Sequence, residues 1–454
     1  VASRGLGDVY KRQILIVGAG KSSPYLIKYL LDNSQKQELD LHIVDLTTNH
    51  LLKYKKNNKC RVSSINLSNE KEIDKFISEA DLVISMLPAK FHIILARTCI
   101  KFKKNLLTAS YVSDEMKTLD NEIKNNGLLF LNEMGLDPGI DHMSAKKIID
   151  NLIKKGSKIN SFKSYTGGLI APDSDNNKWN YKFTWNPRNV ILAGQGVPAK
   201  YIENKKYKYI PYNRLFKTTE KIKIKGYGEF EVYPNRDSLK YRNIYSLNNI
   251  ETMIRGTIRK VGFSESWNMF IKLGLTNDDF KISNSKGMSY RDYLNCFLPF
   301  DKNLSIEDKL AKVLSISKND KNWNKLTEID IFSSARKIPL ENASPAEVLE
   351  FILKDSWKLE KQDKDMIVMY HEFEYENKTR SKEKVLSTMV CKGDDDVYTA
   401  MAKTVGLPLA ISSLLILNDK INLNGIQTPL YSNIYNPVLE ELRKFGINFE
   451  EYKI

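Results

Sequence analysis

The residues best suited to chemistry lie in one loop, residues 132–142, with the sequence Asn-Glu-Met-Gly-Leu-Asp-Pro-Gly-Ile-Asp-His. Two glycines, a proline, three acidic side chains and a histidine follow directly on an apolar run. Asp137 precedes proline, which holds its backbone extended and lets its carboxylate project from the loop. Gly139, Ile140 and the helix start behind them predict a small nest of amide donors for an anionic group.

A second polar pair, Ser110 and Tyr111, stands at the end of the fifth predicted strand. Open α/β sheets bind ligands at the carboxyl ends of their strands, so this pair and Asp137 should meet at one edge. Two residues of the loop also have a plainer interpretation. Asp141 could serve only to stabilise the N-terminus of the following helix, and His142 could be structural.

A dinucleotide signature opens the predicted sheet. Gly18-Ala19-Gly20-Lys21-Ser22-Ser23 follows a strand and begins a helix, with Ser23 where a third glycine often stands. Gly18 allows the tight turn, and Gly20 lets the backbone approach a pyrophosphate at the helix N-terminus. A tight turn without a ligand would need the same glycines. However, Asp45 ends the second strand at the spacing typical of a ribose-binding acid.

Asp45 also bears on the choice of coenzyme. A carboxylate there accepts hydrogen bonds from a ribose 2′-hydroxyl and repels a 2′-phosphate. Its neighbours Leu46, Thr47 and Thr48 include no arginine to bind that phosphate, so the sequence favours NAD over NADP. Met86 lies in Ser-Met-Leu-Pro at the end of the fourth strand, where a backbone edge usually flanks the nicotinamide ribose. The proline alone could also account for the end of that strand.

Three arginines beside turn residues are candidates for binding carboxylates. Arg236 lies in Tyr-Pro-Asn-Arg-Asp-Ser, and Arg255 and Arg259 lie in Arg-Gly-Thr-Ile-Arg. Arginine binds a carboxylate through two parallel hydrogen bonds, so three of them in one domain would suit a substrate with several carboxylates. For each arginine alone, a surface salt bridge is an equally good interpretation.

Apolar strands alternate with helix-period segments from Ile14 to Glu133, which predicts an α/β fold with a Rossmann-like, doubly wound parallel sheet. The predicted strands are Ile14–Val17, Leu41–Leu46, Arg61–Leu67, Asp81–Leu87, Asn105–Ser110 and Leu128–Asn132. The predicted helices are Ser22–Asp32, Leu51–Lys56, Asn69–Glu79, Phe91–Lys103 and Asp114–Asn126.

The pattern changes after a helix predicted at Met143–Lys155. Strands rich in aromatic residues then alternate with period two, which predicts a mixed sheet in a second, α+β domain. Residues 277–355 are polar and helical, which predicts a small helical domain. The other segments predicted here are the strands Phe162–Tyr165, Tyr181–Trp185, Gly228–Tyr233 and Met366–Glu376 and the apolar helix Ala400–Leu417.

The composition argues against several classes of protein. The 454 residues carry a formal net charge of +15. Their lysines are scattered and lack the stacking aromatics of a nucleic-acid motif, so a solvated surface is expected. The four cysteines show no metal-ligand spacing, which favours reduced thiols in the cytoplasm and no metal site. The longest apolar stretch, Val405–Leu417, is too short to cross a bilayer. Val1–Gln13 lacks a signal-peptide core and is expected to lie outside the fold, as a truncated or non-native start.

Taken in order, these segments resemble the saccharopine dehydrogenase family of the L-glutamate-forming type. The resemblance rests on the joint presence of Asn-Glu-x-Gly-Leu-Asp-Pro-Gly-Ile-Asp-His, Tyr-Pro-Asn-Arg-Asp-Ser and Arg-Gly-Thr-x-Arg. It implies three domains, and the open sheet expected in the second of them favours a homodimer. The three domains are a Rossmann-like dinucleotide-binding domain (14–134 and 396–454), an α+β substrate domain with a mixed open sheet (135–276 and 356–395) and a small helical domain (277–355).

The family implies the reversible oxidation of saccharopine, with NAD or NADP and water, to L-glutamate and 2-aminoadipate 6-semialdehyde in lysine metabolism. Carried over by position, the substrate contacts are Ser110, Tyr111, Asp137, Arg236, Thr257, Ile258 and Arg259. Together with the motifs above, the predicted cofactor contacts are Gly18, Ala19, Gly20, Lys21, Ser22, Asp45, Asn66, Leu67, Met86, Leu136, Pro138, Gly139, Ile140, Asp141 and His142. Fungal members have Arg-Thr where this chain has Asp45-Leu46, and Cys where it has Thr166.

Such a reaction requires orientation and proton transfer more than covalent help from the protein. We expect Asp137 and Tyr111 to move protons, through water, to and from the substrate nitrogen, while Arg236 and Arg259 hold carboxylates. A related imine reductase of the same fold, such as a carboxynorspermidine synthase-like enzyme, would share this chemistry. A non-catalytic NAD-binding protein is the alternative from a different class.

Overall fold

The computed structural model describes residues 12–454, and the chain divides into two compact units. The described part of unit 1 runs over residues 12–151 and 397–448, and unit 2 comprises residues 152–396 and 449–454. Most of the segment Val1–Gln13, predicted to lie outside the fold, falls outside the described residues. Its last two residues correct that prediction. Arg12 and Gln13 begin the first strand, and the amide of Gln13 donates to Oδ2 of Asp81 at 2.6 Å.

Unit 1 contains a seven-stranded parallel sheet in the order β15-β6-β5-β4-β1-β2-β3. The strand order reverses beside β1, so the predicted doubly wound sheet is confirmed. Its strands are β1 (Arg12–Val17), β2 (Leu39–Asp45), β3 (Cys60–Ser64), β4 (Leu82–Ser85), β5 (Asn105–Thr108), β6 (Leu129–Leu131) and β15 (Gly425–Gln427). Strands β1, β2 and β4 are almost wholly buried, as expected of a sheet covered on both faces.

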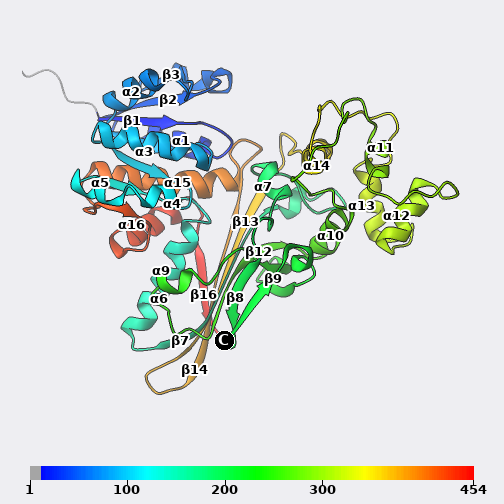
Figure 1. Ribbon diagram of the computed structural model, residues 1–454. Helices are drawn as coiled ribbons and strands as arrows, with labels where there is room; N and C mark the ends of the chain where they lie inside the picture. The colour runs from blue at the N-terminus through cyan, green and yellow to red at the C-terminus, as the bar shows by residue number, and fades with distance from the viewer. Residues whose placement is uncertain (1–11) are drawn as a thin grey trace, which may run out of the picture. The chain divides into compact units, whose positions relative to one another are not determined.

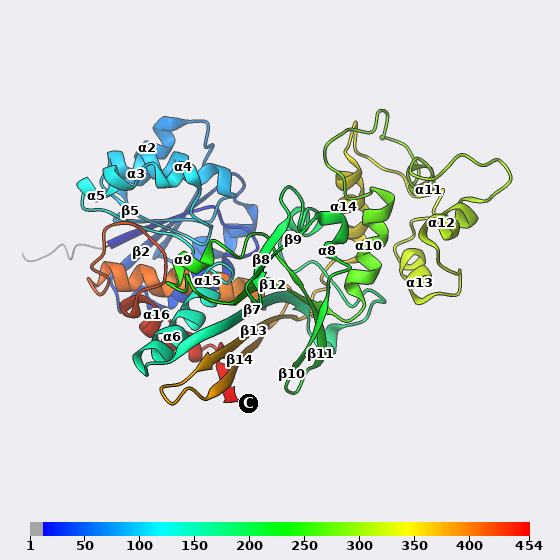
Figure 2. The same cartoon turned by 60° about the horizontal axis from the view of Figure 1, so that its bottom comes forward.

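Helices cover both faces of this sheet. Figure 2 shows α2 to α5 on one side of it and α15 and α16 on the other. Helix α1 packs along α15, and α2 and α3 pack against each other over β1, β4 and β5. The helices are α1 (Pro24–Asn33), η1 (Asn49–Lys56), α2 (Glu70–Glu79), η2 (Ala89–Phe91), α3 (His92–Lys101), α4 (Asp114–Lys117), α5 (Asp120–Asn125), α6 (Ile140–Lys154), α15 (Ala400–Leu417) and α16 (Ser432–Arg443).

Helix α15 corrects the prediction for Val405–Leu417. The apolar stretch belongs to a longer helix of 18 residues with mean hydropathy 1.7, which by length and composition alone could cross a membrane. In the fold, however, 78% of this helix is buried. It packs against α1 and α16 and over β4 and β5, so it is the core helix of unit 1.

Unit 2 is built on a mixed, nine-stranded sheet in the order β10-β11-β12-β7-β13-β14-β16, with β8 paired to β12 and β9 paired to β8. Strands β7 and β12 are parallel and the other pairs are antiparallel. Figure 1 shows the long strands β7, β13 and β14 of this sheet. The strands are β7 (Lys158–Ile170), β8 (Ala199–Glu203), β9 (Lys206–Ile210), β10 (Glu220–Ile224), β11 (Gly228–Pro234), β12 (Thr252–Lys260), β13 (Asp365–Glu376), β14 (Lys382–Lys392) and β16 (Phe449–Lys453).

The helices of unit 2 are η3 (Pro172–Ser174), α7 (Pro187–Ile191), α8 (Tyr212–Leu215), α9 (Tyr241–Ile244), α10 (Phe263–Leu273), α11 (Tyr290–Asn295), α12 (Ile306–Leu314), α13 (Lys321–Glu328) and α14 (Pro345–Ser356). All of them except η3 and α9 share one hydrophobic core with aromatic loop residues, among them Tyr181 and Phe183. The strand predicted at Tyr181–Trp185 does not form. Its alternating aromatics are buried by packing on Trp357 instead, and the amide of Phe183 donates to the Trp357 carbonyl at 2.8 Å.

The compact units also differ from the predicted domain boundaries. Residues 135–151, predicted in the substrate domain, belong to unit 1, because the first turns of α6 are built into the loop that ends the parallel sheet. Residues 449–454, predicted in the dinucleotide domain, belong to unit 2, because β16 pairs with β14. A separate helical domain at 277–355 stays a prediction.

Candidate functional site

The turn after β1 has the geometry of a dinucleotide site. Gly18 has a left-handed backbone with φ of 88°, and a Cβ there would lie 3.1 Å from the carbonyl carbon of Met86. Strain and lack of space therefore both exclude a side chain at Gly18. At Gly20, a Cβ would meet no atom within 4 Å, so the backbone faces open space before α1. That space and the free start of the helix suit a pyrophosphate.

Asp45, at the end of β2, holds this turn in place. Its Oδ2 accepts the amide hydrogen of Ala19 at 2.7 Å, and its Oδ1 accepts that of Thr47 at 3.2 Å. The side chain is only half-buried, which leaves it within reach of a ligand. Asn66 and Leu67 follow β3, the neighbour of β2, at the same edge of the sheet. The structure therefore brings together the predicted cofactor contacts Gly18, Ala19, Gly20, Lys21, Ser22, Asp45, Asn66 and Leu67.

The two predicted proton carriers meet further along this edge. Tyr111, just beyond β5, donates a hydrogen bond from its Oη to Oδ1 of Asp137 at 2.9 Å. Both residues are half-buried. Met86 follows β4, which lies between β1 and β5, and its amide donates to the carbonyl of Val17 at 2.8 Å. The phenol and the carboxylate thus lie at the same edge as the glycine turn, as proton transfer beside a nicotinamide would require.

The predicted nest of free amide donors is not formed. The loop folds back on itself, and a Cβ on Gly139, where φ is 147°, would overlap the carbonyl group of Gly135. The amide of Gly139 donates to Oδ1 of Asp141 at 2.6 Å, and the amide of Ile140 donates to the carbonyl of Gly135 at 2.9 Å. Acceptors within the loop therefore already satisfy the donors that an anion would need.

Three of the predicted cofactor contacts are instead buried inside the protein. Ile140, Asp141 and His142 are at most 1% exposed. His142 Nε2 lies 2.8 Å from Oε2 of Glu133, whose other carboxylate oxygen accepts the amide hydrogen of Val112 at 3.2 Å. These groups hold the loop beside the segment of Tyr111, so their predicted role at the cofactor is not supported. Leu136, Pro138 and Gly139 are buried as well, which leaves Asp137 as the half-exposed member of the loop.

His92, the first residue of α3, was not predicted as part of the site. It is 4% exposed, and its ring joins the ends of two strands. Its Nδ1 lies 2.7 Å from Oγ of Ser85, and its Nε2 lies 2.7 Å from Oγ of Ser110. Burial lowers the pKa of His92 to about 4, so the ring is neutral near pH 7. The only signal in the sequence was a histidine shortly after a strand that ends in serine.

In unit 2, polar side chains form a row across three neighbouring strands. Thr166 on β7, Thr257 on β12 and Tyr233 on β11 are cross-strand partners, so their side chains share one face of the sheet. Arg259 lies two residues beyond Thr257 and therefore shares that face. Its guanidinium lies 5.2 Å from the centre of the Tyr181 ring.

The guanidinium of Arg259 is buried without a counter-ion. The residue is 4% exposed, and within residues 12–454 no carboxylate lies within 4.0 Å of its nitrogens. Within this described part of the chain, Nε of Arg259 and Oγ1 of Thr166 both have no hydrogen-bond partner. Buried charges and polar groups are normally paired, so this face is suited to bind an anionic, hydrogen-bonding ligand.

The other predicted substrate contacts of unit 2 differ in their surroundings. The side chain of Ile258 is fully buried in the apolar core on the opposite face of β12, because side chains alternate along a strand, so only its backbone could contact the substrate. Arg236 follows β11 and is exposed. Arg255 is 8% exposed, and its guanidinium lies 4.0 Å from the centre of the Tyr241 ring.

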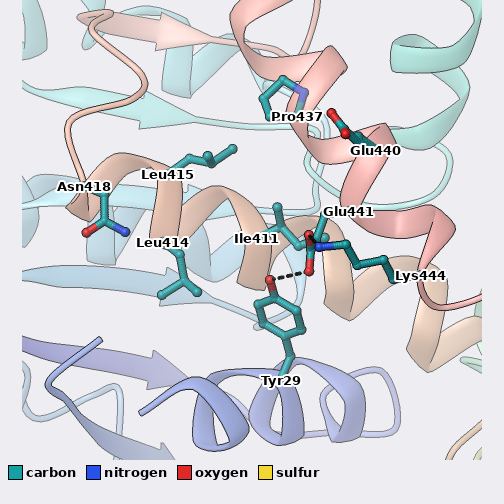
Figure 3. A pocket seen from close by; sticks show the side chains of 9 residues that line it. All are labelled: Tyr29, Ile411, Leu414, Leu415, Asn418, Pro437, Glu440, Glu441 and Lys444. Carbon is teal, nitrogen blue, oxygen red and sulfur yellow. Dashed lines mark hydrogen bonds and ion pairs between the residues drawn. The ribbon is translucent and has the colours of Figure 1, made fainter. Parts of the chain in front are cut away.

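A groove between α1, α15 and α16 offers no comparable set of groups (Figure 3). Leucine and isoleucine side chains form its floor, and Oη of Tyr29 donates to Oε1 of Glu441 at 3.3 Å. Lys444 pairs with the same glutamate at 2.6 Å. Glu441 and Lys444 are therefore already paired within the groove.

Comparisons with known proteins agree with this organisation. The family model of the saccharopine dehydrogenase NADP binding domain matches residues 14–131, and that of the saccharopine dehydrogenase C-terminal domain matches residues 135–447. The L-glutamate-forming, NADP(+) saccharopine dehydrogenase of Saccharomyces cerevisiae is 32% identical over 97% of this chain and 99% of its own length. The solved structure of apo saccharopine dehydrogenase (L-Glu forming) from Saccharomyces cerevisiae matches with a TM-score of 0.88 at 31% identity, over 98% of this chain and 100% of that one.

A longer relative matches over only part of its length. The alpha-aminoadipic semialdehyde synthase of Arabidopsis thaliana is 33% identical over 97% of this chain but only 45% of its own length. This chain therefore spans about half of that protein.

The fold and the site define a nicotinamide-dinucleotide dehydrogenase whose coenzyme domain is joined to a separate mixed-sheet unit. The chain belongs to the saccharopine dehydrogenase family, which confirms the resemblance seen in its motifs.

Proposed function

We propose that this protein is a saccharopine dehydrogenase of the L-glutamate-forming type. It converts saccharopine, NAD(P)⁺ and water into L-glutamate, 2-aminoadipate 6-semialdehyde, NAD(P)H and a proton, and it can run in reverse. The observation that carries this proposal is the hydrogen bond of 2.9 Å between Tyr111 and Asp137, at the sheet edge that also carries the glycine turn. The names of the relatives support the choice of substrate.

The bound coenzyme supplies a hydride acceptor at the carboxyl edge of the parallel sheet, where Gly18, Gly20 and Asp45 would hold it. Asp137 takes the proton of the substrate amine through a water molecule, and later assists the water that releases the aldehyde. Tyr111 orients this carboxylate by donating a hydrogen bond to it. Neither residue needs to form a covalent bond.

Unit 2, taken by itself, carries two buried groups that are suited to bind a carboxylate. Among the described residues, the buried cation of Arg259 has no counter-ion within 4.0 Å and the buried hydroxyl of Thr166 has no hydrogen-bond partner. A substrate carboxylate satisfies both at once. Arg236 is exposed and available for a second carboxylate.

We also propose NAD as the preferred coenzyme. The carboxylate of Asp45 is anchored by two backbone amides and half-exposed at the end of β2, where a 2′-phosphate would meet its negative charge. The names of the fungal relatives point the other way, since they specify NADP(+). Coenzyme preference therefore needs its own measurement. A homodimer and a cytoplasmic location remain predictions from the sequence.

One assay tests the activity and the coenzyme together. The purified protein is mixed with saccharopine and either NAD⁺ or NADP⁺, and the absorbance of the reduced nicotinamide is followed. The reverse reaction uses glutamate and the semialdehyde. We expect turnover in both directions and a higher kcat/KM with NAD⁺. A decarboxylated analogue of saccharopine should be a poor substrate, because it leaves a buried arginine unpaired. A preference for that analogue would indicate an imine reductase with a different substrate.

A further inference from the structure

His92 lies in a chain of hydrogen bonds that begins inside the protein and ends at the candidate site. Ser85 closes β4 and is 1% exposed, His92 is 4% exposed, and Ser110 beyond β5 is half-buried. The two distances along this hydrogen-bond chain, from Ser85 Oγ to Nδ1 of His92 and from Nε2 of His92 to Ser110 Oγ, are both 2.7 Å. The ring therefore connects a buried hydroxyl to one that a ligand can reach.

The buried serine determines which ring nitrogen carries the proton. Among the described residues, Nδ1 of His92 is the only partner of the Ser85 hydroxyl. A buried hydroxyl proton without an acceptor is costly, so Ser85 donates and Nδ1 accepts. The ring is neutral near pH 7, which leaves its single proton on Nε2.

The proton on Nε2 then determines the direction in which the hydroxyl of Ser110 can donate its hydrogen bond. Nε2 donates to Oγ of Ser110 at 2.7 Å, with Oγ1 of Thr108 further away at 3.3 Å. The amide of Ser110 is held by the same Thr108 oxygen at 3.3 Å. Because Ser110 Oγ accepts from the ring, its own proton is free to point outward. In the opposite tautomer, with the ring proton on Nδ1, the hydroxyl of Ser110 would donate to Nε2. It would then present only oxygen lone pairs to the ligand.

We propose that His92 is a positioning residue that directs the hydroxyl proton of Ser110 toward a carboxylate of the substrate. This inference rests on the proposed function, because it assigns Ser110 to the substrate. A polarised chain from Ser85 through His92 to Ser110 ends on a negative charge, which strengthens each of its hydrogen bonds. Ser110 therefore favours a ligand group with an anionic oxygen. A protonated amine in the same position would bring its own N–H donors against the hydroxyl proton of Ser110.

The experiment is a double-mutant cycle on Ser85 and Ser110. Ser85→Ala leaves His92 and Ser110 in place but removes the group that sets the tautomer. We expect it to raise the KM for saccharopine on the order of tenfold, as loss of a hydrogen bond to a charged group does, with the KM for the coenzyme unchanged. Ser110→Ala should raise the KM at least as much. The double variant should be no worse than Ser110→Ala alone, because Ser85 acts only through Ser110.

A matched control exists in the same unit. His42 is another buried histidine, whose Nε2 lies 2.9 Å from Oγ of Ser63, and this pair has no hydrogen bond to Ser110. Ser63→Ala should leave the KM for saccharopine unchanged. Thermal melting of every variant, and a His92→Gln variant that keeps an amide donor in the ring's place, separate a folding defect from a loss of positioning. His92→Gln should recover part of the affinity that His92→Leu loses.

The outcomes distinguish this inference from the proposed function. A wild type that oxidises saccharopine, together with additive effects of Ser85→Ala and Ser110→Ala, contradicts the role of His92 and leaves the proposed function standing. An effect on the KM for the coenzyme instead would also contradict it, because Ser110 would then serve the coenzyme. A wild-type protein without saccharopine-dependent turnover would contradict both this inference and the proposed function.

Discussion

Asp137 is the half-exposed side chain of a loop whose other members are buried, so a substrate can reach its carboxylate. Asp137→Asn keeps the size of the side chain and an oxygen for the hydroxyl of Tyr111, but it removes the group that takes a proton. We expect turnover to fall about a hundredfold or more, as loss of a general base does. Steady-state kinetics with saccharopine and fluorescence titration of the coenzyme measure the two effects separately.

The dissociation constant of the coenzyme should stay within about twofold in that variant, because Asp137 lies outside the glycine turn. Tyr111→Phe is the matched control. It removes the hydrogen bond to Asp137 but not the carboxylate, so its loss of turnover should be smaller. Wild-type turnover in Asp137→Asn would exclude the carboxylate from proton transfer.

Asp45 combines two roles, since it anchors the glycine turn through the amide of Ala19 and carries the charge that would repel a 2′-phosphate. Asp45→Asn keeps an oxygen for that amide and removes the charge. The ratio of kcat/KM for NAD to that for NADP should fall about tenfold, mostly through the KM for NADP. A ratio that does not change on substitution would show that the selectivity comes from other residues.

At the scale of elements, the packing of α1 on α15 depends on Gly406. A Cβ at Gly406 would lie 2.8 Å from the backbone nitrogen of Leu26 and 3.2 Å from the carbonyl oxygen of Ser22. Gly406→Ala therefore forces the two helices apart, which should cost about 1–3 kcal/mol of stability. Because α1 begins at the glycine turn, the KM for the coenzyme should rise as well.

Gly20→Ala is the matched control for that variant, because its added methyl group would meet no atom within 4 Å. It should leave the melting temperature of the free protein unchanged and weaken only the binding of the coenzyme, because the pyrophosphate needs the space at Gly20. Melting curves with and without coenzyme measure both effects. Equal melting temperatures for Gly406→Ala and wild type would show that α1 and α15 adjust without cost.

The elements show why sequence patterns predict some parts of this protein and miss others. Six of the seven strands of the parallel sheet and the helix Ala400–Leu417 were predicted in the right order, because burial on both faces leaves long apolar runs. The seventh strand, β15, has only three residues and was not predicted. Tyr181–Trp185 was predicted as a strand because its aromatic residues alternate. The same alternation arises here in a loop, where the distant residue Trp357 buries the Tyr181 ring. Local periodicity carries no information about that partner.

Among the site residues too, the sequence predicts some positions and misses others. Tyr111 and Asp137 follow strands of one sheet, so their meeting could be predicted from the strand order alone. The predicted amide nest at Gly139 failed because Asp141, two residues away, supplies the acceptor itself. His92 was missed because a histidine at the start of a helix has no spacing that distinguishes it from a core residue.

At the scale of the whole molecule, two buried histidines make the stability of unit 1 sensitive to acid. Burial lowers the pKa of His42 and of His92 from 6.5 to about 4. The unfolded chain binds protons at both rings below pH 6.5, while the folded protein does so only near pH 4. Stability is therefore fully present above pH 6.5 and falls toward pH 4, by about 3 kcal/mol for each ring.

Melting temperatures measured between pH 7 and pH 4.5 test this. The wild type should lose more stability over this range than His42→Gln or His92→Gln, whose side chains do not titrate. The comparison isolates each histidine from the carboxylates, which contribute equally to both proteins. Parallel curves for wild type and variants would mean that the rings become protonated without unfolding.

The last strand of the chain joins unit 2, although the residues before it belong to unit 1. β16 covers the edge of β14, and the ring of Phe449 stacks on buried His371 with 5.9 Å between ring centres. Deleting residues 449–454 leaves an unpaired strand edge, which is a site for self-association. We expect a lower melting temperature and larger assemblies in light scattering, with coenzyme binding unchanged because unit 1 keeps all of its residues. Phe449→Ala keeps the strand pairing and removes only the ring, so it should lower the melting temperature without promoting assembly. A truncated protein with the size distribution of the wild type would show that β14 tolerates an open edge.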